Sequence, residues 1–231
     1  MLLKLVSLGV LGGMAELDRT SIFHGLLSEP IVLSPLAGYI LGDWALGFKV
    51  GVLLQLFFLG NASMGGSSPP DAAMSAMATV ISASLAARYF SISSEISVPI
   101  AILVVMFPAS MVGKAIDMWQ KESNVALLNN TEEKIGSDGA AAVEKAVWIS
   151  IAENFAIYTG AMVIVAAIGT LCVSLVSYLL PQSWWYGIKI TGDLLLPASA
   201  GIALASLRGR WSVFVYVLAG ICMWIFVMSI R

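Results

Sequence analysis

The chain has 231 residues, of which 59% are hydrophobic and only 11% are charged, and its mean hydropathy is +0.91. Soluble domains carry about 25% charged residues, so this chain cannot cover a globule with polar surface, and we expect it to lie in a lipid bilayer. Its net charge of −2 and its isoelectric point near 5.3 argue against a nucleic-acid partner, because no basic surface is available to contact phosphates.

Taken in chain order, the apolar segments differ in length. A transmembrane helix needs about 20 apolar residues. Residues 96–113, 155–180 and 211–230 meet or approach that length, whereas residues 5–15, 31–42, 50–60, 72–87 and 194–207 are too short. Short, interrupted segments are typical of transporters, which build sites inside the membrane from broken helices. The sequence therefore predicts an all-α polytopic membrane protein with full-length and broken transmembrane helices, whose first segment is retained rather than cleaved.

The stretch GGSSPPDAA, residues 65–73, interrupts the apolar sequence with backbone that cannot be regular. Such backbone is tolerated at membrane depth only inside protein or beside a water-filled cavity. We predict a re-entrant hairpin with arms at residues 50–60 and 72–87 and a tip at residues 65–71. Pro70 suits the start of the second arm, and Asp71 in its first turn complements the helix dipole. An ordinary loop between two short transmembrane helices is the alternative.

Residues 114–145 form the one long polar segment and hold four of the twelve lysines and arginines. The segment is too polar to span a bilayer, and we expect NNTEE (129–133) followed by GSDG (136–139) to separate two helical pieces. Its lysines favour the cytoplasmic side. We therefore divide the chain into a membrane half at residues 1–113, which contains the substrate hairpin at about 50–87, a polar connection at 114–145, and a second membrane half at 146–231.

No set of residues predicts an enzyme. His24 is the single histidine, which we expect at the membrane interface, and Cys172 and Cys222 lie in apolar runs where they read as packing residues. No glycine-rich phosphate-binding motif is present. We expect no catalytic residue, no metal and no cofactor.

Polar residues inside or beside apolar segments are the remaining candidates. They are Asp43, Gln55, Asn61, Ser63, Ser67, Ser68, Asp71, Glu153, Asn154 and Asp193. Ionisable groups inside a membrane are costly, so each is a functional candidate, with a position at the headgroup level as the alternative. Gln55 stands out because leucine and phenylalanine surround it, and a buried amide needs hydrogen-bond partners. Amides and carboxylates can also bind sugar hydroxyls, which both donate and accept hydrogen bonds.

Six motifs spread over nearly the whole chain carry a resemblance to a known family. They are LDRT (17–20), PIVLSPLAGYILGD (30–43), GVLLQLFFLG (51–60), GSSPPDAAMSA (66–76), VWISIAENFAIYTGAMVIVAAIG (147–169) and GIKITGDLLLPASAGIALASL (187–207). In this order they resemble the IIC subunit of the mannose-type (mannose–fructose–sorbose) family of the phosphoenolpyruvate-dependent sugar phosphotransferase system.

The resemblance implies a permease subunit of the bacterial inner membrane that binds a sugar and translocates it. Its implied partners are a second membrane subunit, IID, in a hetero-oligomer, and soluble IIA and IIB proteins that carry phosphoryl groups, with IIB phosphorylating the sugar. It also implies that a hairpin-bearing core moves against a fixed scaffold. The implied sugar-binding residues are Gln55, Ser63, Gly65, Gly66 and Asp71, with Asp43 nearby. Many relatives carry glutamate in place of Gln55 and asparagine in place of Ser63.

Two other classes of function remain open on the sequence. One is a secondary transporter or channel that acts alone, which would need ligands for a coupling ion and no IID partner. The other is a membrane scaffold or sensor that has kept the fold of the family and lost the sugar site. The departures at Gln55 and Ser63 give this last alternative some weight, while a transport subunit remains the leading hypothesis.

Overall fold

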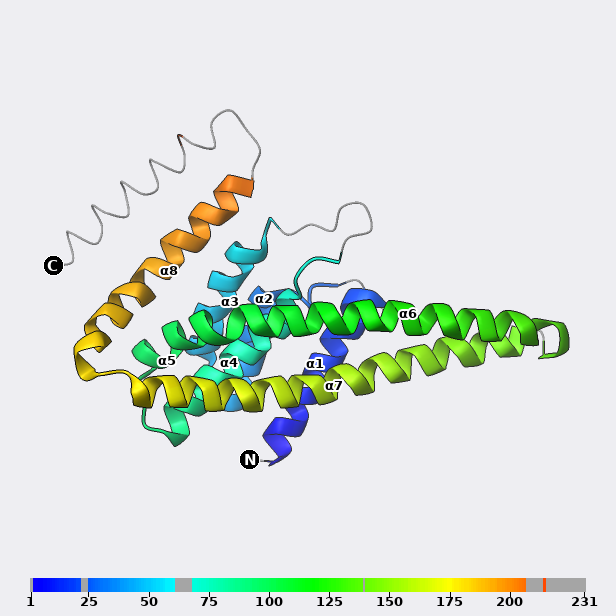
Figure 1. Cartoon of the computed structure of the whole chain (residues 1–231), viewed down its shortest axis with the longest axis horizontal. Helices are drawn as coiled ribbons and strands as arrows, with labels where there is room; N and C mark the ends of the chain where they lie inside the picture. Colours follow the sequence, from blue (N-terminus) through cyan, green and yellow to red (C-terminus); the bar gives the residue numbers. More distant parts are fainter. Residues whose placement is uncertain (1, 22–24, 61–67, 139, 207–213, 215–231) are drawn as a thin grey trace.

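A computed structural model of the chain describes residues 2–21, 25–60, 68–138, 140–206 and 214. The helices are α1 (Leu2–Thr20), α2 (Pro30–Leu41), α3 (Trp44–Phe58), α4 (Ala72–Tyr89), α5 (Ser94–Ala101), the π-helical turn η1 (Ile102–Met106), α6 (Phe107–Asp138), α7 (Ala140–Leu179), the 3-10 turn η2 (Gln182–Trp184) and α8 (Trp185–Ser206). No strand occurs within these ranges, so the prediction of an all-α protein is confirmed (Figure 1).

Helix α4 lies at the centre of the molecule. Every residue from 73 to 86 is buried, and the helix contacts α2, α3, α5, α6 and α7. Its sequence, AAMSAMATVISASLAARY, is rich in alanine and serine, and small side chains let neighbouring helices approach closely inside a membrane protein. A helix without an exposed face belongs to the protein interior. The start of α4, which Asp71 caps, is therefore held inside the protein.

Helices α2 and α3 form a short antiparallel hairpin. The chain turns at Gly42, whose φ of 92° is left-handed and favours glycine. Close packing of the two helices depends on Gly38, where a Cβ atom would lie 2.6 Å from the carbonyl oxygen of Asp43. At 1.5 Å per residue the helices are about 18 and 22 Å long, which is less than the roughly 30 Å thickness of a hydrocarbon core. Both helices are therefore too short to cross a bilayer, as the sequence predicts for broken transmembrane helices.

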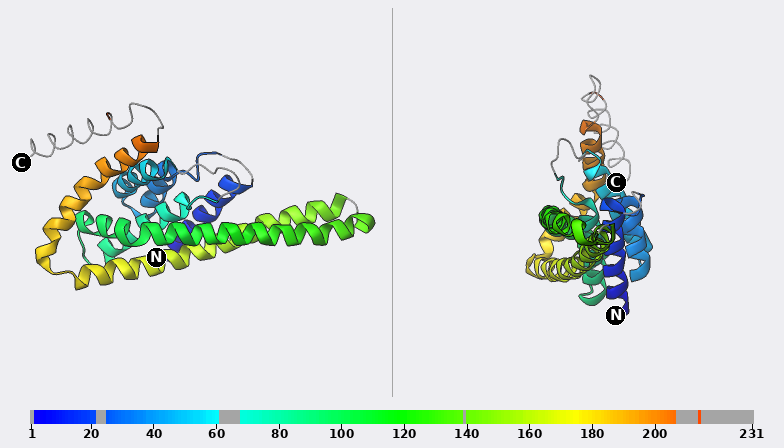
Figure 2. Two further views of the ribbon diagram at one scale, coloured as in Figure 1. Left: turned by 45° about the horizontal axis from the view of Figure 1, so that its top comes forward. Right: turned by 90° about the vertical axis from the view of Figure 1, so that its right-hand side faces the viewer.

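Three stretches are long and apolar enough to cross a membrane, judged by length and composition: Ser94–Glu132, Ala140–Leu179 and Gln182–Ser206. The first contains the predicted long segment 96–113, and the second contains the predicted segment 155–180 except for its last residue. Helices α6 and α7 lie side by side and project together well beyond the other helices (Figures 1 and 2). The predicted segment 211–230 lies outside the described residues, apart from residue 214.

Four sequence predictions about helix boundaries are wrong. Residues 50–60 were expected to form a short segment of their own, but α3 begins at Trp44 and contains Lys49. Residues 5–15 belong to the 19-residue helix α1, which continues through Glu16 and Arg19. Residues 194–207 are not a short element, because α8 starts at Trp185 and carries Asp193 on an exposed face. NNTEE does not separate two helices but lies inside α6, which continues to Asp138. In each case a charged or polar residue was expected to end a helix, whereas the helix continues through that residue.

The predicted re-entrant hairpin is described only in its arms. Helix α3 ends at Phe58 and α4 begins at Ala72, while residues 61–67 lie outside the described residues. Asp71 is the residue before the first turn of α4 rather than part of it. The path of the tip stays a prediction.

Candidate functional site

Asp71 is a buried cap at the start of the central helix. Its Oδ1 accepts a hydrogen bond from the backbone N–H of Met74 at 3.0 Å, which satisfies a free donor at the N-terminus of α4. Its Oδ2 accepts from the hydroxyl of Tyr158 on α7 at 2.7 Å. Its own N–H donates to the carbonyl oxygen of Ser110 on α6 at 3.1 Å. Asp71 therefore joins α4, α6 and α7.

Around Asp71 lies a charge cluster, which we define as Glu16, Arg19, Asp71, Asp117 and Lys121. Nη2 of Arg19 lies 3.0 Å from the Glu16 carboxylate and 3.6 Å from a carboxylate oxygen of each of the two aspartates. Lys121 contacts Asp117 at 3.0 Å. The side chains of Glu16 and Asp71 are fully buried. Because an unpaired buried charge is costly, these mutual contacts allow the carboxylates to remain inside the protein.

Gly113 lets α6 pack directly on this cluster. A Cβ atom at position 113 would lie 2.5 Å from both the Cβ and the Oδ2 of Asp71, closer than real Cβ contacts come. The contact joins the N-terminal part of α6 to the cap of α4. The glycine is therefore part of the site although it carries no functional group.

Gln55 fixes the start of α2. Its Nε2 donates to Oε2 of Glu29 at 2.8 Å, and its Oε1 accepts from the backbone N–H of Ile31 at 3.2 Å. Glu29 precedes α2 but makes no capping hydrogen bond with its own side chain, so the Gln55 amide takes over that role. The expectation that this amide needs partners is met by residues 24 and 26 positions away in the sequence.

Gln55 also lines a pocket of about 440 Å³, which we call the Gln55 pocket. The other polar side chains of its lining are Arg19, Ser28 and Glu29, and Pro69 and Pro70 form the part of its wall next to α4. The structure therefore brings Gln55 together with the end of the predicted hairpin tip. Asp71 is not part of the lining, but it contacts Arg19, which is.

Asp43 lies away from this pocket. It caps the start of α3 by accepting from the N–H of Leu46 at 3.1 Å. Gln55 is 12 residues further along the same helix, which corresponds to about 18 Å at 1.5 Å per residue. The neighbouring end of α2 is held by Arg88, whose Nη1 donates to the carbonyl oxygen of Leu41 at 3.2 Å. Asp43 is thus placed at the opposite end of the α2–α3 hairpin.

The remaining candidates are distributed over the molecule. Ser63, Gly65 and Gly66 lie outside the described residues, as do Asn61, Ser67, His24 and Cys222. Ser68 accepts a hydrogen bond from Lys121 at 2.7 Å. Glu153 accepts from Ser123 at 3.4 Å, which ties α7 to α6. Within the ranges that the structure describes, no group of three or more His, Cys, Asp or Glu residues could hold a metal ion.

Sequence reasoning missed Glu16, Arg19, Glu29, Asp117 and Tyr158. A signal was available for one pair, since Glu16 and Arg19 are three residues apart and so share a helix face. Asp117 and Lys121 likewise have a spacing of four, but both were assigned to a polar connection. Tyr158 lies in an apolar run and carries no signal of its own. Only the packing of α7 on α4 reveals its role.

The fold and its buried polar groups define a multi-pass helical membrane protein. The chain belongs to the family described as the sorbose-specific IIC component of the phosphotransferase system, whose model matches residues 2–230. It is a membrane IIC component of the mannose-type phosphotransferase permease family, so the resemblance carried by its motifs is confirmed.

Individual relatives agree with this assignment. The putative N-acetylgalactosamine permease IIC component 2 of Escherichia coli is 32% identical over 107 residues, which cover 46% of this chain and 78% of the relative. The mannose-specific EIIC component of Escherichia coli is 23% identical over 206 residues, which cover 87% and 71%.

Two solved structures share the fold at 19% identity. One, described as a membrane protein, has a TM-score of 0.68 and covers 100% of this chain and 94% of that chain. The other is the mannose transporter ManYZ in complex with a microcin; its TM-score is 0.60, and the match covers 96% of this chain and 86% of that chain.

Proposed function

We propose that this chain binds a sugar in the Gln55 pocket and carries it across the bacterial inner membrane, where IIB phosphorylates it. The observation that carries the proposal is the meeting of a carboxylate, an amide and a guanidinium, from Glu29, Gln55 and Arg19, in one pocket of about 440 Å³. Pockets for small ligands measure about 300–1,000 Å³ and combine apolar walls with a few polar groups. This set offers both donors and acceptors to hydroxyls.

The roles of the residues follow from their positions. Glu29 accepts from sugar hydroxyls, and Gln55 both orients that carboxylate and offers its own amide. Arg19 donates from the wall that faces the charge cluster. Asp71 acts as a positioning residue: it holds Arg19 and the start of α4, and it influences the sugar without touching it. We include Ser63, Gly65 and Gly66 among the proposed sugar-binding residues because they lie in the chain between Gln55 and Pro69.

A IID subunit completes the path in this proposal. The part of the chain that the structure describes supplies three long apolar helices. The mannose transporter with the same fold is a two-part assembly by its name, ManYZ. The chain itself carries out no phosphoryl transfer in this scheme and hands the sugar to IIB, which receives its phosphoryl group from IIA.

Phosphoenolpyruvate-dependent sugar uptake tests the proposal in cells that carry the chain with and without IID. Uptake should require IID and should fall in Glu29→Gln, because a hydrogen bond to a charged acceptor contributes about 1.5–3 kcal/mol, which is roughly a 10- to 150-fold change in affinity. The matched control is Glu122→Gln, an exposed residue of α6, which should transport normally.

The alternatives give different results. Uptake by the chain alone, driven by an ion gradient, would establish a secondary transporter. A wild-type chain that assembles with IID but moves no sugar would establish a scaffold. Normal uptake in Glu29→Gln, at matched abundance in the membrane, would show that the sugar lies elsewhere.

A further inference from the structure

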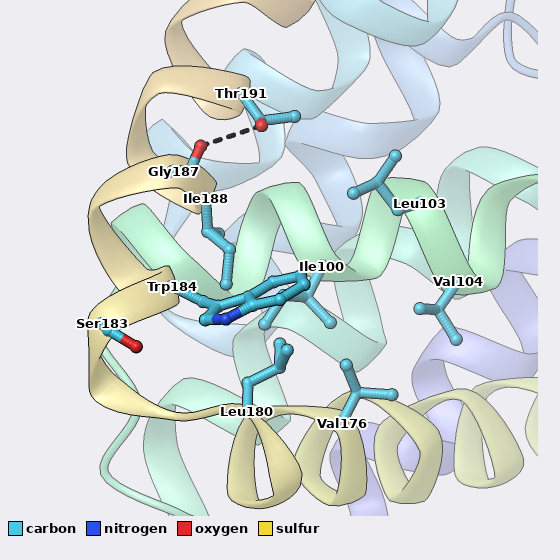
Figure 3. Close-up of a pocket in the computed structure, with 10 residues that line it drawn as sticks. All are labelled: Ile100, Leu103, Val104, Val176, Leu180, Ser183, Trp184, Gly187, Ile188 and Thr191. Carbon is cyan, nitrogen blue, oxygen red and sulfur yellow. Dashed lines mark hydrogen bonds between the residues drawn. The ribbon is translucent and has the colours of Figure 1, made fainter.

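A second, larger pocket lies between the end of α7, the start of α8 and the α5–η1 segment, and we call it the wedge pocket. Its volume is about 660 Å³. Figure 3 shows Val176 of α7 and Leu180, the residue after α7, on one side, Ile100 and Leu103 on another, and the Trp184 ring directed into the space between them. The pocket is separate from the Gln55 pocket, with which it shares no lining residue.

The lining of the wedge pocket is unsuited to a sugar. It contains no charged side chain among the described residues, and its only side-chain hydroxyls are those of Ser183 and Thr191. The Thr191 hydroxyl donates to the carbonyl oxygen of Gly187 at 2.9 Å, within its own helix (Figure 3). The Ser183 hydroxyl and the indole N–H of Trp184 are the other side-chain polar groups of the lining, so a polar ligand would lose its hydration here and gain few partners. The pocket therefore suits an apolar ligand.

The apolar residues around the wedge pocket are exposed in the single chain. Leu103 and Trp184 in its wall are 62% and 63% exposed, and Leu175 and Leu179 next to it on α7 are similarly exposed. In a chain that crosses a membrane, such apolar surface contacts acyl chains. Trp184, Trp185 and Tyr186 follow one another at the turn between α7 and α8, and aromatic residues of this kind lie at the headgroup level. The pocket thus extends from that level into the hydrocarbon.

The shape of the pocket favours a chain over a helix. Helices α7 and α8 are joined by residues 180–184, so the wedge is closed at its vertex, as Figures 1 and 3 show. A helix with its side chains is about 10–12 Å wide and needs a groove that continues along its length. From α7 and the residue that follows it, only Val176 and Leu180 line the pocket, a span of roughly one helical turn. An acyl chain needs only a narrow slot that opens to the bilayer on one side.

We propose that the wedge pocket binds one acyl chain of a phospholipid, whose headgroup lies beside Trp184 in the leaflet that contains η2. The exposed ion pair between Lys189 and Glu95, at 2.7 Å, joins α8 to the start of α5 beside the pocket. The bound chain fills the space between α7 and α8 and stabilises the angle between them. This lipid is held by three helical walls and therefore exchanges more slowly than the lipids around it.

Gly187 offers a direct test. A Cβ atom built on Gly187 meets no atom within 4 Å, so Gly187→Leu places a side chain in the pocket without displacing protein. Gly160→Leu is the matched control: its Cβ also meets nothing within 4 Å, but it lies on an exposed face of α7 outside the pocket. Both changes replace a poor helix former with a good one, so neither should weaken its helix.

The full chain is reconstituted in phosphatidylethanolamine vesicles with a small fraction of phosphatidylcholine that carries a photoreactive diazirine near the end of one acyl chain. After illumination, labelled peptides are mapped by mass spectrometry. We expect labelling on residues 176–191 and 100–104 of the wild type and of Gly160→Leu, and loss of most of it in Gly187→Leu. Val104→Phe fills the same space from the facing wall and should lose it as well.

Thermal unfolding of the same proteins in detergent gives an independent readout. Added phosphatidylethanolamine should raise the Tm of the wild type and of Gly160→Leu more than that of Gly187→Leu, in which the side chain already fills the wedge. Labelling that Gly187→Leu and Val104→Phe retain, or labelling absent from these peptides in the wild type, would overturn the proposal. Either result leaves the assignment of the sugar pocket untouched, because sugar uptake is measured separately.

Discussion

Gln55→Glu tests the geometry of the Gln55 pocket most sharply. In the wild type, Nε2 of Gln55 donates to the Glu29 carboxylate at 2.8 Å. The substitution keeps the size of the side chain but replaces this donor with an acceptor that faces the same carboxylate. The hydrogen bond that is lost has a charged acceptor and is worth about 1.5–3 kcal/mol. Both side chains are half-buried, so screening limits the added repulsion to about 1 kcal/mol. The resemblance implies glutamate at this position in many relatives and so predicts tolerance, whereas the contact with Glu29 predicts a loss of stability.

The sign of the pH dependence follows from the same contact. Two neighbouring carboxyl groups can share one proton, and the folded variant then holds a proton that the unfolded chain releases. Stability of Gln55→Glu relative to the wild type should therefore rise as the pH falls. Thermal unfolding of the purified chain at neutral and mildly acidic pH measures it, with the exposed Gln182→Glu as the matched control. A variant as stable as the wild type at neutral pH, with no dependence on pH, would refute the contact.

Three further predictions concern the charge cluster. Gly113→Ala should destabilise the protein, because the new Cβ would lie 2.5 Å from Asp71, whereas Gly160→Ala in open space should be neutral or gain about 0.5–1 kcal/mol; denaturation midpoints compare the two. Tyr158→Phe should lower the unfolding free energy by about 1.5–3 kcal/mol, since it removes a donor to a buried carboxylate, and an unchanged midpoint would place the hydroxyl elsewhere. Asp71→Asn should keep the cap on α4 but slow sugar uptake by releasing Arg19, which uptake at matched abundance measures.

The sequence predicted the helices better than their ends. Apolar runs identify α2, α4 and the membrane parts of α6 and α7, because burial or lipid contact is the same requirement along the whole run. The end of α1 was misjudged because Glu16 was taken to leave the membrane. A carboxylate can stay inside when it is paired, and its partner Arg19 is itself held by Asp71 and Asp117, which come 52 and 98 residues later in the chain. The sequence of α1 therefore does not indicate those partners.

The candidate site was predictable in part for a related reason. Gln55 could be singled out because an amide among leucines needs partners, but Glu29 as its partner depends on how α3 packs against α2. Asp43 was grouped with Gln55 because both lie in family motifs. A continuous helix from Trp44 to Phe58 separates them by about 18 Å, and this distance follows from the sequence once Lys49 is accepted as part of the helix.

Arg19 belongs both to the Gln55 pocket and to the charge cluster. It lines the Gln55 pocket, while its Nε and Nη2 donate to Glu16 at 3.2 and 3.0 Å and its Nη2 lies 3.6 Å from Asp71 and Asp117. The cluster holds three carboxylates and two cations, and each of the three carboxylates contacts Arg19. Arg19 is therefore held firmly from the inner side. The position of this guanidinium in the pocket wall is set by α1, by the cap of α4 and by α6. Asp71, the last residue of the predicted hairpin tip, caps α4 and contacts Arg19, so the end of the tip borders the pocket both through Arg19 and through Pro69 and Pro70.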